Sequence, residues 1–328
     1  MQDIKALVIG DVHICDHAPG KRVEGYRENI LAKLYECVKI AKDNACTHVI
    51  FLGDIFHIKV PNRVSHSIVQ DMADVFLAFD LPVFVLVGNH DITHGTLDTL
   101  PKQPLGTLAY IPEVTLLTDE PYQLDDDVTL YPIAGTSDIT IDNFEIQGDN
   151  KRDIMLVHQS VVPDIGTEPE VIQHILFDSK LVAERTNIDI VLYGHQHRYD
   201  GIYERQREDG STATFSNLGS ICRLTIGDGD IDKEPAVMLL TIAADENRTT
   251  DMEIIKLNEV LPSHEVYHLD EHLEQKEHSK DIDETIKKLQ ATEVSAFSID
   301  GVIDEVETRT DIDDRVKTTA LDLLEEVR

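Results

Sequence analysis

The chain has 328 residues and 41% of them are apolar, which suffices for a buried core in one large domain or in one domain with a small appendage. No run of about 18 apolar residues occurs, and the N-terminus has the pattern of a strand rather than of a signal peptide, so we expect no membrane-spanning helix. Four cysteines without a CxxC pair favour a cytoplasmic protein, and a net charge of −33 argues against nucleic-acid binding through a generally basic surface.

Three short apolar runs in the first third of the chain predict strands, at residues 4–9, 48–52 and 82–87. Apolar residues at helical spacing lie between them, over residues 26–41 and 64–79. Strand–helix–strand order with almost continuously apolar strands predicts parallel strands with helices packed on the sheet.

The rest of the main region is richer in predicted strands, with Gly, Asp and Asn at the turns. These strands are expected at residues 114–117, 128–133, 154–157, 188–193, 211–217, 221–226, 236–242 and 252–257. Two sheets, each covered by helices, accommodate all of these elements. We therefore predict an α/β fold, a four-layer α-β-β-α sandwich of two mixed sheets.

The composition changes after residue 258. Residues 270–290 and 313–327 have the apolar stripe of amphipathic helices, and residues 295–299 between them have the pattern of a short strand. We predict a main domain over residues 1–258 and a small α+β appendage over residues 259–328.

Polar side chains follow five of the predicted strands directly. Because sites in open α/β sheets lie at the carboxyl ends of strands, we expect these side chains to converge. They are Asp11 and His13, then Asp54 and His57, then Asn89, His90 and Asp91, then His158, and finally His195 and His197. Each of these short motifs is weak alone, but five in order, each after a strand, are difficult to attribute to structural roles only.

Asp, Asn and His together offer mixed oxygen and nitrogen ligands. Such a set suits Mn, Fe or Zn better than Ca, which takes oxygen ligands only. Asp11 and His13 are two residues apart, so at the end of a strand both can project to the same side, and His195 and His197 repeat this spacing. The sequence therefore predicts a transition-metal site.

The ordered set of D-x-H, G-D, G-N-H-D, H and G-H-x-H resembles the calcineurin-like metallophosphoesterase family over roughly residues 4–200. Two segments give a finer match. Residues 53–57 (Gly-Asp-Ile-Phe-His) followed by Pro61, and residues 217–224, are similar to the double-strand-break repair nucleases, whose bacterial member is SbcD. The compact chain is also similar in size to phage-encoded members of that branch.

The resemblance implies two divalent metal ions, of which Mn2+ is the favoured choice and Fe, Zn or Mg are alternatives. One ion would be held by Asp11, His13, Asp54 and His197. The other would be held by Asn89, His158 and His195, with Asp54 bridging the two. Paired ions of this kind clamp a phosphate and activate water for in-line attack.

The same resemblance assigns supporting roles. His90 is the expected general acid, or a donor to the charge of the transition state. Asp91 is expected to orient His90, and His57 to position the phosphate, with a surface histidine as the alternative for His57.

Four cations near the motifs are candidates for contacts to a nucleic-acid backbone. We assign substrate binding to Arg198 and Arg223, and interpret Lys59 and Arg63 as ordinary solvated charges.

The resulting prediction is a metal-dependent DNA exonuclease and endonuclease, the nuclease subunit of an SbcCD-like DNA repair or recombination complex. The resemblance implies that the C-terminal helices dock on an SMC-like ATPase of the SbcC type, and it allows a homodimer. A phosphomonoesterase or cyclic-nucleotide phosphodiesterase of the same fold is the alternative, and a non-catalytic scaffold is a third.

The net charge conflicts with DNA binding, because phosphate contacts dominate the affinity of nucleic-acid-binding proteins. The acidity is uneven: residues 1–80 carry 9 Lys and Arg against 11 Asp and Glu, whereas residues 246–328 carry 10 against 23. A partner that supplies most of the DNA binding, an acidity that serves solubility, and a small substrate are the three explanations that the sequence leaves open.

Overall fold

The computed structural model describes residues 2–20, 22–224, 226, 231, 233–269, 306, 309 and 312–326. It divides into two compact units, Met1–Tyr267 and His268–Arg328. The first unit contains every strand that the described residues form, and residues 259–267, which the sequence placed with the appendage, lie in it. None of the described helices is long and apolar enough to cross a membrane.

The first sheet has six strands in the order β14-β13-β1-β2-β3-β4. Strands β1 to β4 run parallel, while β13 and β14 are antiparallel additions at one edge. Their bounds are Ile4–Ile9 (β1), His48–Phe51 (β2), Val83–Leu86 (β3), Val114–Leu117 (β4), Ala236–Ile242 (β13) and Thr250–Lys256 (β14).

The second sheet also has six strands, in the order β11-β12-β10-β7-β6-β5. Its four inner strands are parallel and its two edge strands antiparallel, so both sheets are mixed as predicted. Their bounds are Tyr122–Asp125 (β5), Val128–Ile133 (β6), Arg152–Val157 (β7), Ile190–Tyr193 (β10), Gly201–Gln206 (β11) and Thr212–Asn217 (β12). A small extra pair joins Val161–Val162 (β8) to Phe177–Asp178 (β9).

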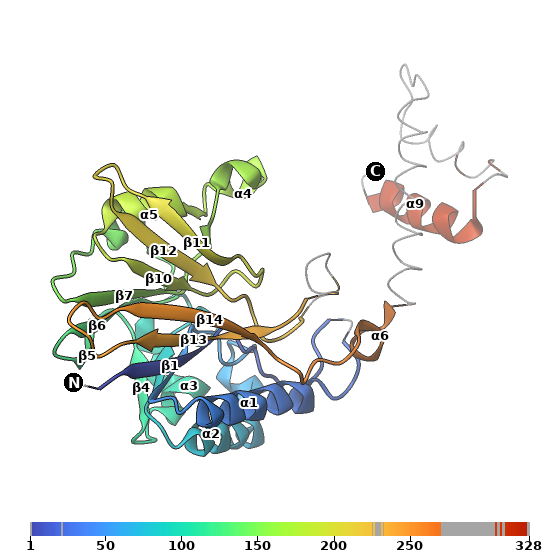
Figure 1. Cartoon of the computed structure of the whole chain (residues 1–328). Coiled ribbons are helices and arrows are strands. Elements are labelled where there is room, and N and C mark those ends of the chain that lie inside the picture. Colours follow the sequence, from blue (N-terminus) through green and yellow to red (C-terminus); the bar gives the residue numbers. More distant parts are fainter. Residues whose placement is uncertain are drawn as a thin grey trace. The chain divides into compact units, whose positions relative to one another are not determined.

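Helices α1, α2 and α3 cover the outer face of the first sheet, and α5 covers that of the second (Figure 1). Those of the first unit are Tyr26–Asp43 (α1), His66–Phe79 (α2), Pro104–Leu108 (α3), Glu170–Gln173 (α4), Ser179–Arg185 (α5) and Ser263–Val266 (α6). In the second unit, Asp314–Glu326 (α9) falls where the sequence predicts its last amphipathic helix. The predicted helix over 270–290 and the strand over 295–299 lie outside the described residues.

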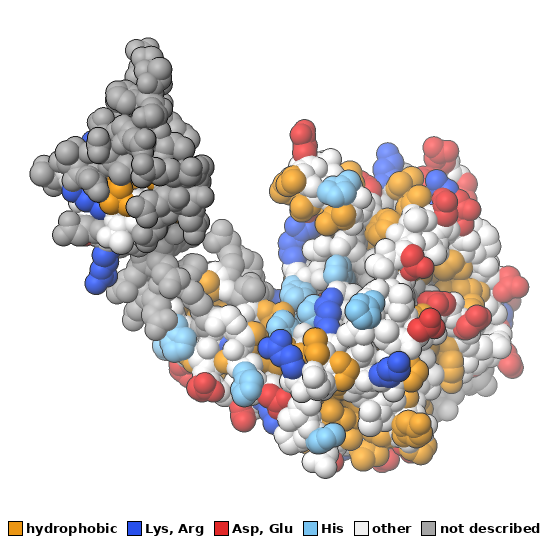
Figure 2. Space-filling view, turned by 180° about the vertical axis from the view of Figure 1, so that it is seen from behind, with side chains coloured by type: hydrophobic (Ala, Val, Ile, Leu, Met, Phe, Trp, Pro, Cys, Tyr) orange, Lys and Arg blue, Asp and Glu red, His pale blue; other side chains and the backbone are white. Residues whose placement is uncertain are grey.

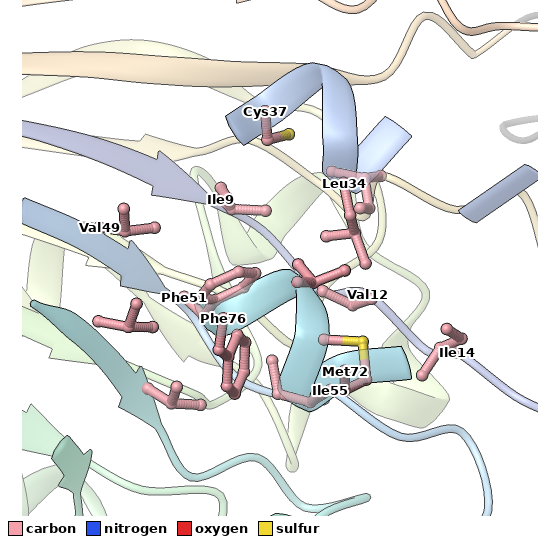
Figure 3. Close-up of a cluster of buried hydrophobic side chains, with 14 of the residues drawn as sticks. Ile9, Val12, Ile14, Leu34, Cys37, Val49, Phe51, Ile55, Met72 and Phe76 are labelled. Carbon is pink, nitrogen blue, oxygen red and sulfur yellow. The ribbon is translucent and has the colours of Figure 1, made fainter. Parts of the chain in front are cut away.

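Successive side chains along a strand point to opposite faces of the sheet, and this alternation produces the four layers. In β1, Leu7 and Ile9 belong to the core under α1 and α2, whereas Ala6 and Val8 belong to the core between the sheets. Figure 3 shows the first of these cores, where Leu34 from α1 and Met72 from α2 meet the strand residues. A third core lies between the second sheet and α5. The predicted α-β-β-α sandwich is therefore confirmed, because each strand has two apolar faces to bury.

The strand prediction differs from the structure at several places, since β5, β8, β9 and β11 were not predicted and one predicted strand is absent. The segment 221–226 was predicted as a strand, but residues 221–224 form bends and irregular backbone. Ile221 and Cys222 are apolar because they are buried in the core under α1 rather than paired in a sheet. Strand β11 was missed because its sequence, GIYERQ, alternates around a half-exposed edge and carries three polar residues.

Candidate metal centre

The seven predicted metal ligands converge in the first unit. Three of the contributing loops follow the parallel strands β1, β2 and β3 of the first sheet, and two follow β7 and β10 of the second. Hydrogen bonds hold these loops together: the N–H groups of Val12 and His13 donate to the Asp54 carbonyl over 3.1 and 2.9 Å, and His195 N–H donates to the Asp11 carboxylate over 3.0 Å. The site thus spans both sheets.

One cluster of candidate ligands contains Asp11, His13 and His197, whose ligand atoms lie within 4.8 Å of one another. The Nε2 atoms of His13 and His197 are 2.8 Å apart, and His197 Nε2 is 3.6 Å from Asp11 Oδ2. Asp11 and His13 are fully buried, while His197 is partly exposed. This grouping matches the predicted ligands of one metal ion.

A second cluster contains Asp54, His158 and His195, again within 4.8 Å of one another. Asn89 joins it, since its Oδ1 lies 2.9 Å from His195 Nδ1 and 3.2 Å from His158 Nε2. His158 Nδ1 is 2.7 Å from the Leu52 carbonyl, which fixes the ring and leaves Nε2 facing the cluster. These four residues are the predicted ligands of the other ion.

Asp54 connects the two clusters. Its Oδ2 is 3.4 Å from His13 Nε2, and its Oδ1 is 3.3 Å from His158 Nε2. The carboxylate therefore presents one oxygen to each group of histidines. A carboxylate in this position is suited to bridge two cations.

The electrostatics of the site fit the binding of cations. Burial raises the pKa of Asp11 to about 7. Burial lowers the pKa of His13 well below its usual range, and lowers that of His195 to about 4. Burial opposes the charge of Asp54 too, yet the His158 ring beside it holds the pKa of this carboxyl well below its usual range. Asp54 in turn raises the pKa of His158 to about 10 against the effect of burial. Buried carboxylates that face the neutral imidazoles of His13 and His195 are a set that divalent ions would stabilise.

Unpaired ligand atoms support the same conclusion. Asn89 Oδ1 faces only His158, His195 and Asp54, and each of these presents lone pairs to it. Uncompensated lone pairs at a buried position are costly unless a cation is bound, so the donor set fits metal ions.

The backbone at the site is strained. His13, Asp54 and His195 have φ values of 51°, 50° and 75°, in the left-handed region that non-glycine residues rarely occupy. Each such residue costs on the order of 1–3 kcal/mol and persists only where the surrounding structure enforces it. Three of the candidate ligands share this strain, which is typical of a functional site.

Gly53 and Gly88 have no side chain, which allows the backbone after β2 and β3 to lie close to other candidate ligands. A Cβ at Gly53, whose φ is 109°, would overlap the His158 ring, and a Cβ at Gly88 would overlap Asp54. Any larger residue at either position would displace a candidate ligand.

His57 and His90 lie beside the first cluster. The His90 ring is 4.8 Å from that of His13 and is stacked on that of His57 at 5.5 Å. His90 N–H donates to Asp54 Oδ1 over 2.7 Å, and His90 Nδ1 is 2.6 Å from the His57 carbonyl, so the Nε2 edge of the ring remains for other contacts. Both histidines are therefore brought to the site as expected.

Asp91 does not have the contact that was predicted for it. Its buried carboxylate accepts hydrogen bonds from the N–H groups of Ile55, Phe56 and Gly88, over 3.0 to 3.3 Å, and does not bind the His90 ring. The His57 carbonyl is the group that holds His90. Asp91 instead ties the loop after β2 to the loop after β3, because the backbone there needs an acceptor that a sheet no longer supplies.

The two predicted substrate-binding arginines differ. Arg198 is exposed next to His197 and pairs with Glu168 and Asp200 at 3.0 and 2.9 Å, so it lies at the edge of the site. Arg223 is buried, and its guanidinium donates to the Leu261 and Ile231 carbonyls. The assignment of Arg223 as a surface contact is therefore corrected to a structural role.

Some histidines form a visible patch on one face of the first unit. Figure 2 shows several His side chains gathered there with Lys and Arg side chains close by. The sequence analysis interpreted Lys59 as a solvated charge, but its Nζ lies 3.0 Å from the outer atom of the Asn89 amide. Its position in the loop that carries Asp54 and His57 was the signal that could have identified it.

Comparisons with known proteins agree with this site. The family model for calcineurin-like phosphoesterases matches residues 4–199, which is more than half of the chain. No curated protein matches the chain in sequence.

Solved structures show only distant likeness. An NAD nucleotidase from Haemophilus influenzae is 13% identical, with a TM-score of 0.45. The match covers 78% of this chain and 56% of that one. A dimetal phosphatase from Danio rerio is 12% identical, with 79% of this chain covering all of that one at a TM-score of 0.46. An archaeal phosphodiesterase is 14% identical, with 77% covering all of that one at 0.36. On the family match over residues 4–199, this chain belongs to the calcineurin-like phosphoesterase family.

Proposed function

We propose that this member of a family of metal-dependent hydrolases is a two-metal DNA nuclease that cleaves phosphodiester bonds. The observation that carries the two-metal part is the position of Asp54, with one oxygen 3.4 Å from His13 and the other 3.3 Å from His158. One ion would be held by Asp11, His13, Asp54 and His197, and the other by Asp54, Asn89, His158 and His195. When bound, the ions polarise the phosphate and acidify a water.

The chain's own residues supply the rest. The His90 ring is held through Nδ1 by the His57 carbonyl, so its other nitrogen would donate a proton to the leaving oxygen. The half-buried His57, stacked on His90, would contact a phosphoryl oxygen. Arg198 at the margin would bind the backbone of a longer substrate, although its two carboxylate partners lower its availability.

The choice of DNA as the substrate rests on sequence segments 53–57 and 217–224, which are similar to those of the SbcD-type nucleases. The local charge supports it, since the histidine patch has cations around it in a chain of net charge −33. We further propose that an SMC-like ATPase partner supplies most of the DNA binding and that the amphipathic C-terminal region, which includes α9, docks on it. Mn2+ is the proposed ion.

A test compares two substrates on the full chain loaded with Mn2+. The purified protein is assayed on an end-labelled DNA duplex and on p-nitrophenyl phosphate, with and without the co-purified ATPase and ATP. We expect cleavage of the duplex that increases with the partner. Turnover of the small ester alone would contradict the DNA assignment while leaving the two-metal chemistry in place.

Asp54→Asn is the variant that tests the two-metal site in the same assay, and Asp126→Asn is its matched control. Asp126 is exposed in the β5–β6 turn and contributes to neither cluster of candidate ligands. If Asp54→Asn loses activity and Asp126→Asn does not, the bridging role is supported. Equal activity in both would remove the basis for it.

Hydrolysis of a small phosphate ester is the second candidate function. It is favoured by the acidity of the chain, whose net charge of −33 repels a polyanion more strongly than a small one. The same duplex and small-ester assays distinguish it.

A further inference from the structure

The amide of Asn89 has two ends in different surroundings. Its Oδ1 faces His195 Nδ1, His158 Nε2 and Asp54 Oδ2 at 2.9, 3.2 and 3.3 Å. Its other end, Nδ2, lies 3.0 Å from Lys59 Nζ. An amide that ligates a metal ion does so through its oxygen, which is this orientation. In the reversed orientation the amide nitrogen would donate to two of these three groups and the oxygen would accept from Lys59, an arrangement that is available only when no cation is bound.

The metal-binding orientation leaves two donors in contact. A lysine ammonium has three hydrogen-bond donors and no acceptor, and an amide NH2 group has donors only. At 3.0 Å, Asn89 Nδ2 and Lys59 Nζ are close enough for one oxygen to accept from both. The acceptor that fits a positively charged donor pair is an anionic oxygen.

The neighbouring groups indicate the same ligand. Lys59 follows His57 by two residues, and the buried His57 Nδ1 has no hydrogen-bond partner among the described residues. The His57 ring is stacked on that of His90. Lys59 lies against Asn89 of the second cluster, and His57 and His90 lie beside His13 of the first. These donors thus lie at both clusters of candidate ligands, where the phosphate of a phosphoester would lie.

We propose that Lys59, together with Asn89 Nδ2, binds a non-bridging oxygen of the substrate phosphate, and that this contact forms only when metal ions are bound. Metal binding turns the Asn89 oxygen inward and so creates the donor pair. In the metal-free protein the oxygen turns outward and Lys59 is satisfied by it. Lys59 is thus a phosphate-binding residue whose function depends on metal occupancy, and the inference rests on the proposed two-metal site but not on DNA as the substrate.

The experiment uses inorganic phosphate as the probe and the full chain as the sample. Phosphate binding is measured by calorimetry for wild type, Lys59→Met and the control Lys42→Met, each with Mn2+ and each metal-free, and bound Mn2+ is counted in all samples. Lys42 is exposed in the last turn of α1 and keeps the same change of charge.

We expect Lys59→Met to weaken phosphate binding of the Mn2+ form by roughly ten- to hundredfold, the effect of losing one hydrogen bond to a charged group. The Mn2+ content stays at the wild-type value, and metal-free wild type and Lys59→Met bind phosphate equally poorly. Lys42→Met behaves as wild type.

Three results would overturn the inference. Equal phosphate affinity of the Mn2+ forms of wild type and Lys59→Met shows that Lys59 does not bind phosphate. A lower Mn2+ content in Lys59→Met shows that Lys59 positions the Asn89 ligand instead. If Lys59→Met weakens phosphate binding by the same factor without metal, the contribution of Lys59 does not depend on metal occupancy. If wild type binds fewer than two Mn2+ ions, the proposed function itself fails, which the metal count identifies separately.

Discussion

Two buried clusters of ionisable side chains meet at Ile221 and are stabilised in different ways. On one side, Ile221 N–H donates to the Asp11 carbonyl over 2.9 Å, at the metal centre. On the other, the Ile221 carbonyl accepts from Lys33 Nζ over 2.9 Å, in a cluster that also contains Arg22, Arg223 and Lys233. The metal centre contains carboxylates and histidines, whereas the group around Lys33 contains cations.

The cations of the second group donate hydrogen bonds to backbone carbonyls. Arg22 donates to the Arg223 carbonyl over 3.0 Å, and Lys233 donates to the Cys222 carbonyl over 3.2 Å. These bonds fix segment 220–224, which has no sheet partners of its own. At the metal centre the lone pairs of ligands face one another instead. Buried charge alone therefore does not identify a functional site. The groups that face the buried charges do identify it.

The largest expected effect follows from removing the link between the ligand clusters. Asp54→Asn keeps the size of the side chain but removes the negative charge that two cations would share. We expect at least about a thousandfold loss of phosphodiesterase activity together with loss of bound metal, because metal ions contribute several kcal/mol to such reactions. Metal analysis and single-substrate kinetics check it. Full activity with two bound ions would end the two-metal interpretation.

His90→Ala tests the acid without removing a ligand. Activity should fall by roughly 10²- to 10⁴-fold, the usual contribution of a general acid. The number of bound metal ions should not change. A substrate with a good leaving group, such as a nitrophenyl ester, should lose less than a DNA duplex, because a weakly basic leaving group needs less protonation. Equal losses on both would assign His90 to charge stabilisation rather than to proton transfer.

Asp91→Asn should have a smaller effect. The carboxylate accepts from three backbone N–H groups that hold the loops after β2 and β3, and an amide replaces one of its acceptor oxygens with a donor. We expect metal affinity to fall by about 10- to 100-fold, as for other groups that support ligands. Mn2+ titration followed by activity measures it. An unchanged affinity would show that the contacts of His90 with Asp54 and His57 hold these loops well enough.

Lys33→Met probes the cation cluster and should affect stability rather than activity. Burial lowers the pKa of Lys33 to about 7, whereas the unfolded chain has the ordinary value of 10.5. Between these values the unfolded chain binds a proton that the folded chain lacks, so wild-type stability rises with pH in this window. The variant lacks this dependence. It should be more stable by on the order of 2 kcal/mol near pH 7, with an advantage that shrinks toward pH 10.

Urea unfolding at pH 7 and pH 9 measures the effect, with the exposed Lys42→Met as the control. A variant less stable than wild type at both values would mean that the hydrogen bond to the Ile221 carbonyl outweighs the cost of burying the ammonium.

The sequence by itself determined the ligands and the layers. Each of the seven candidate ligands follows an apolar strand, and parallel strands bring their carboxyl ends to one edge, so the sequence alone predicts their convergence. The alternation of Leu7 and Ile9 against Ala6 and Val8 similarly predicted strands buried on both faces. These features are local in sequence, which is why pattern reasoning finds them.

Only the tertiary structure decided the partners. Arg223 and Arg198 look alike in sequence, yet Arg223 is buried against Leu261 and Arg198 is exposed beside Glu168. Asp91 follows His90 in the chain but binds the backbone of Ile55 instead. Lys59 lies against Asn89 although 30 positions separate them. The reason is that hydrogen-bond partners are set by which loops meet in space, and loop conformations depend on contacts between segments far apart in the chain.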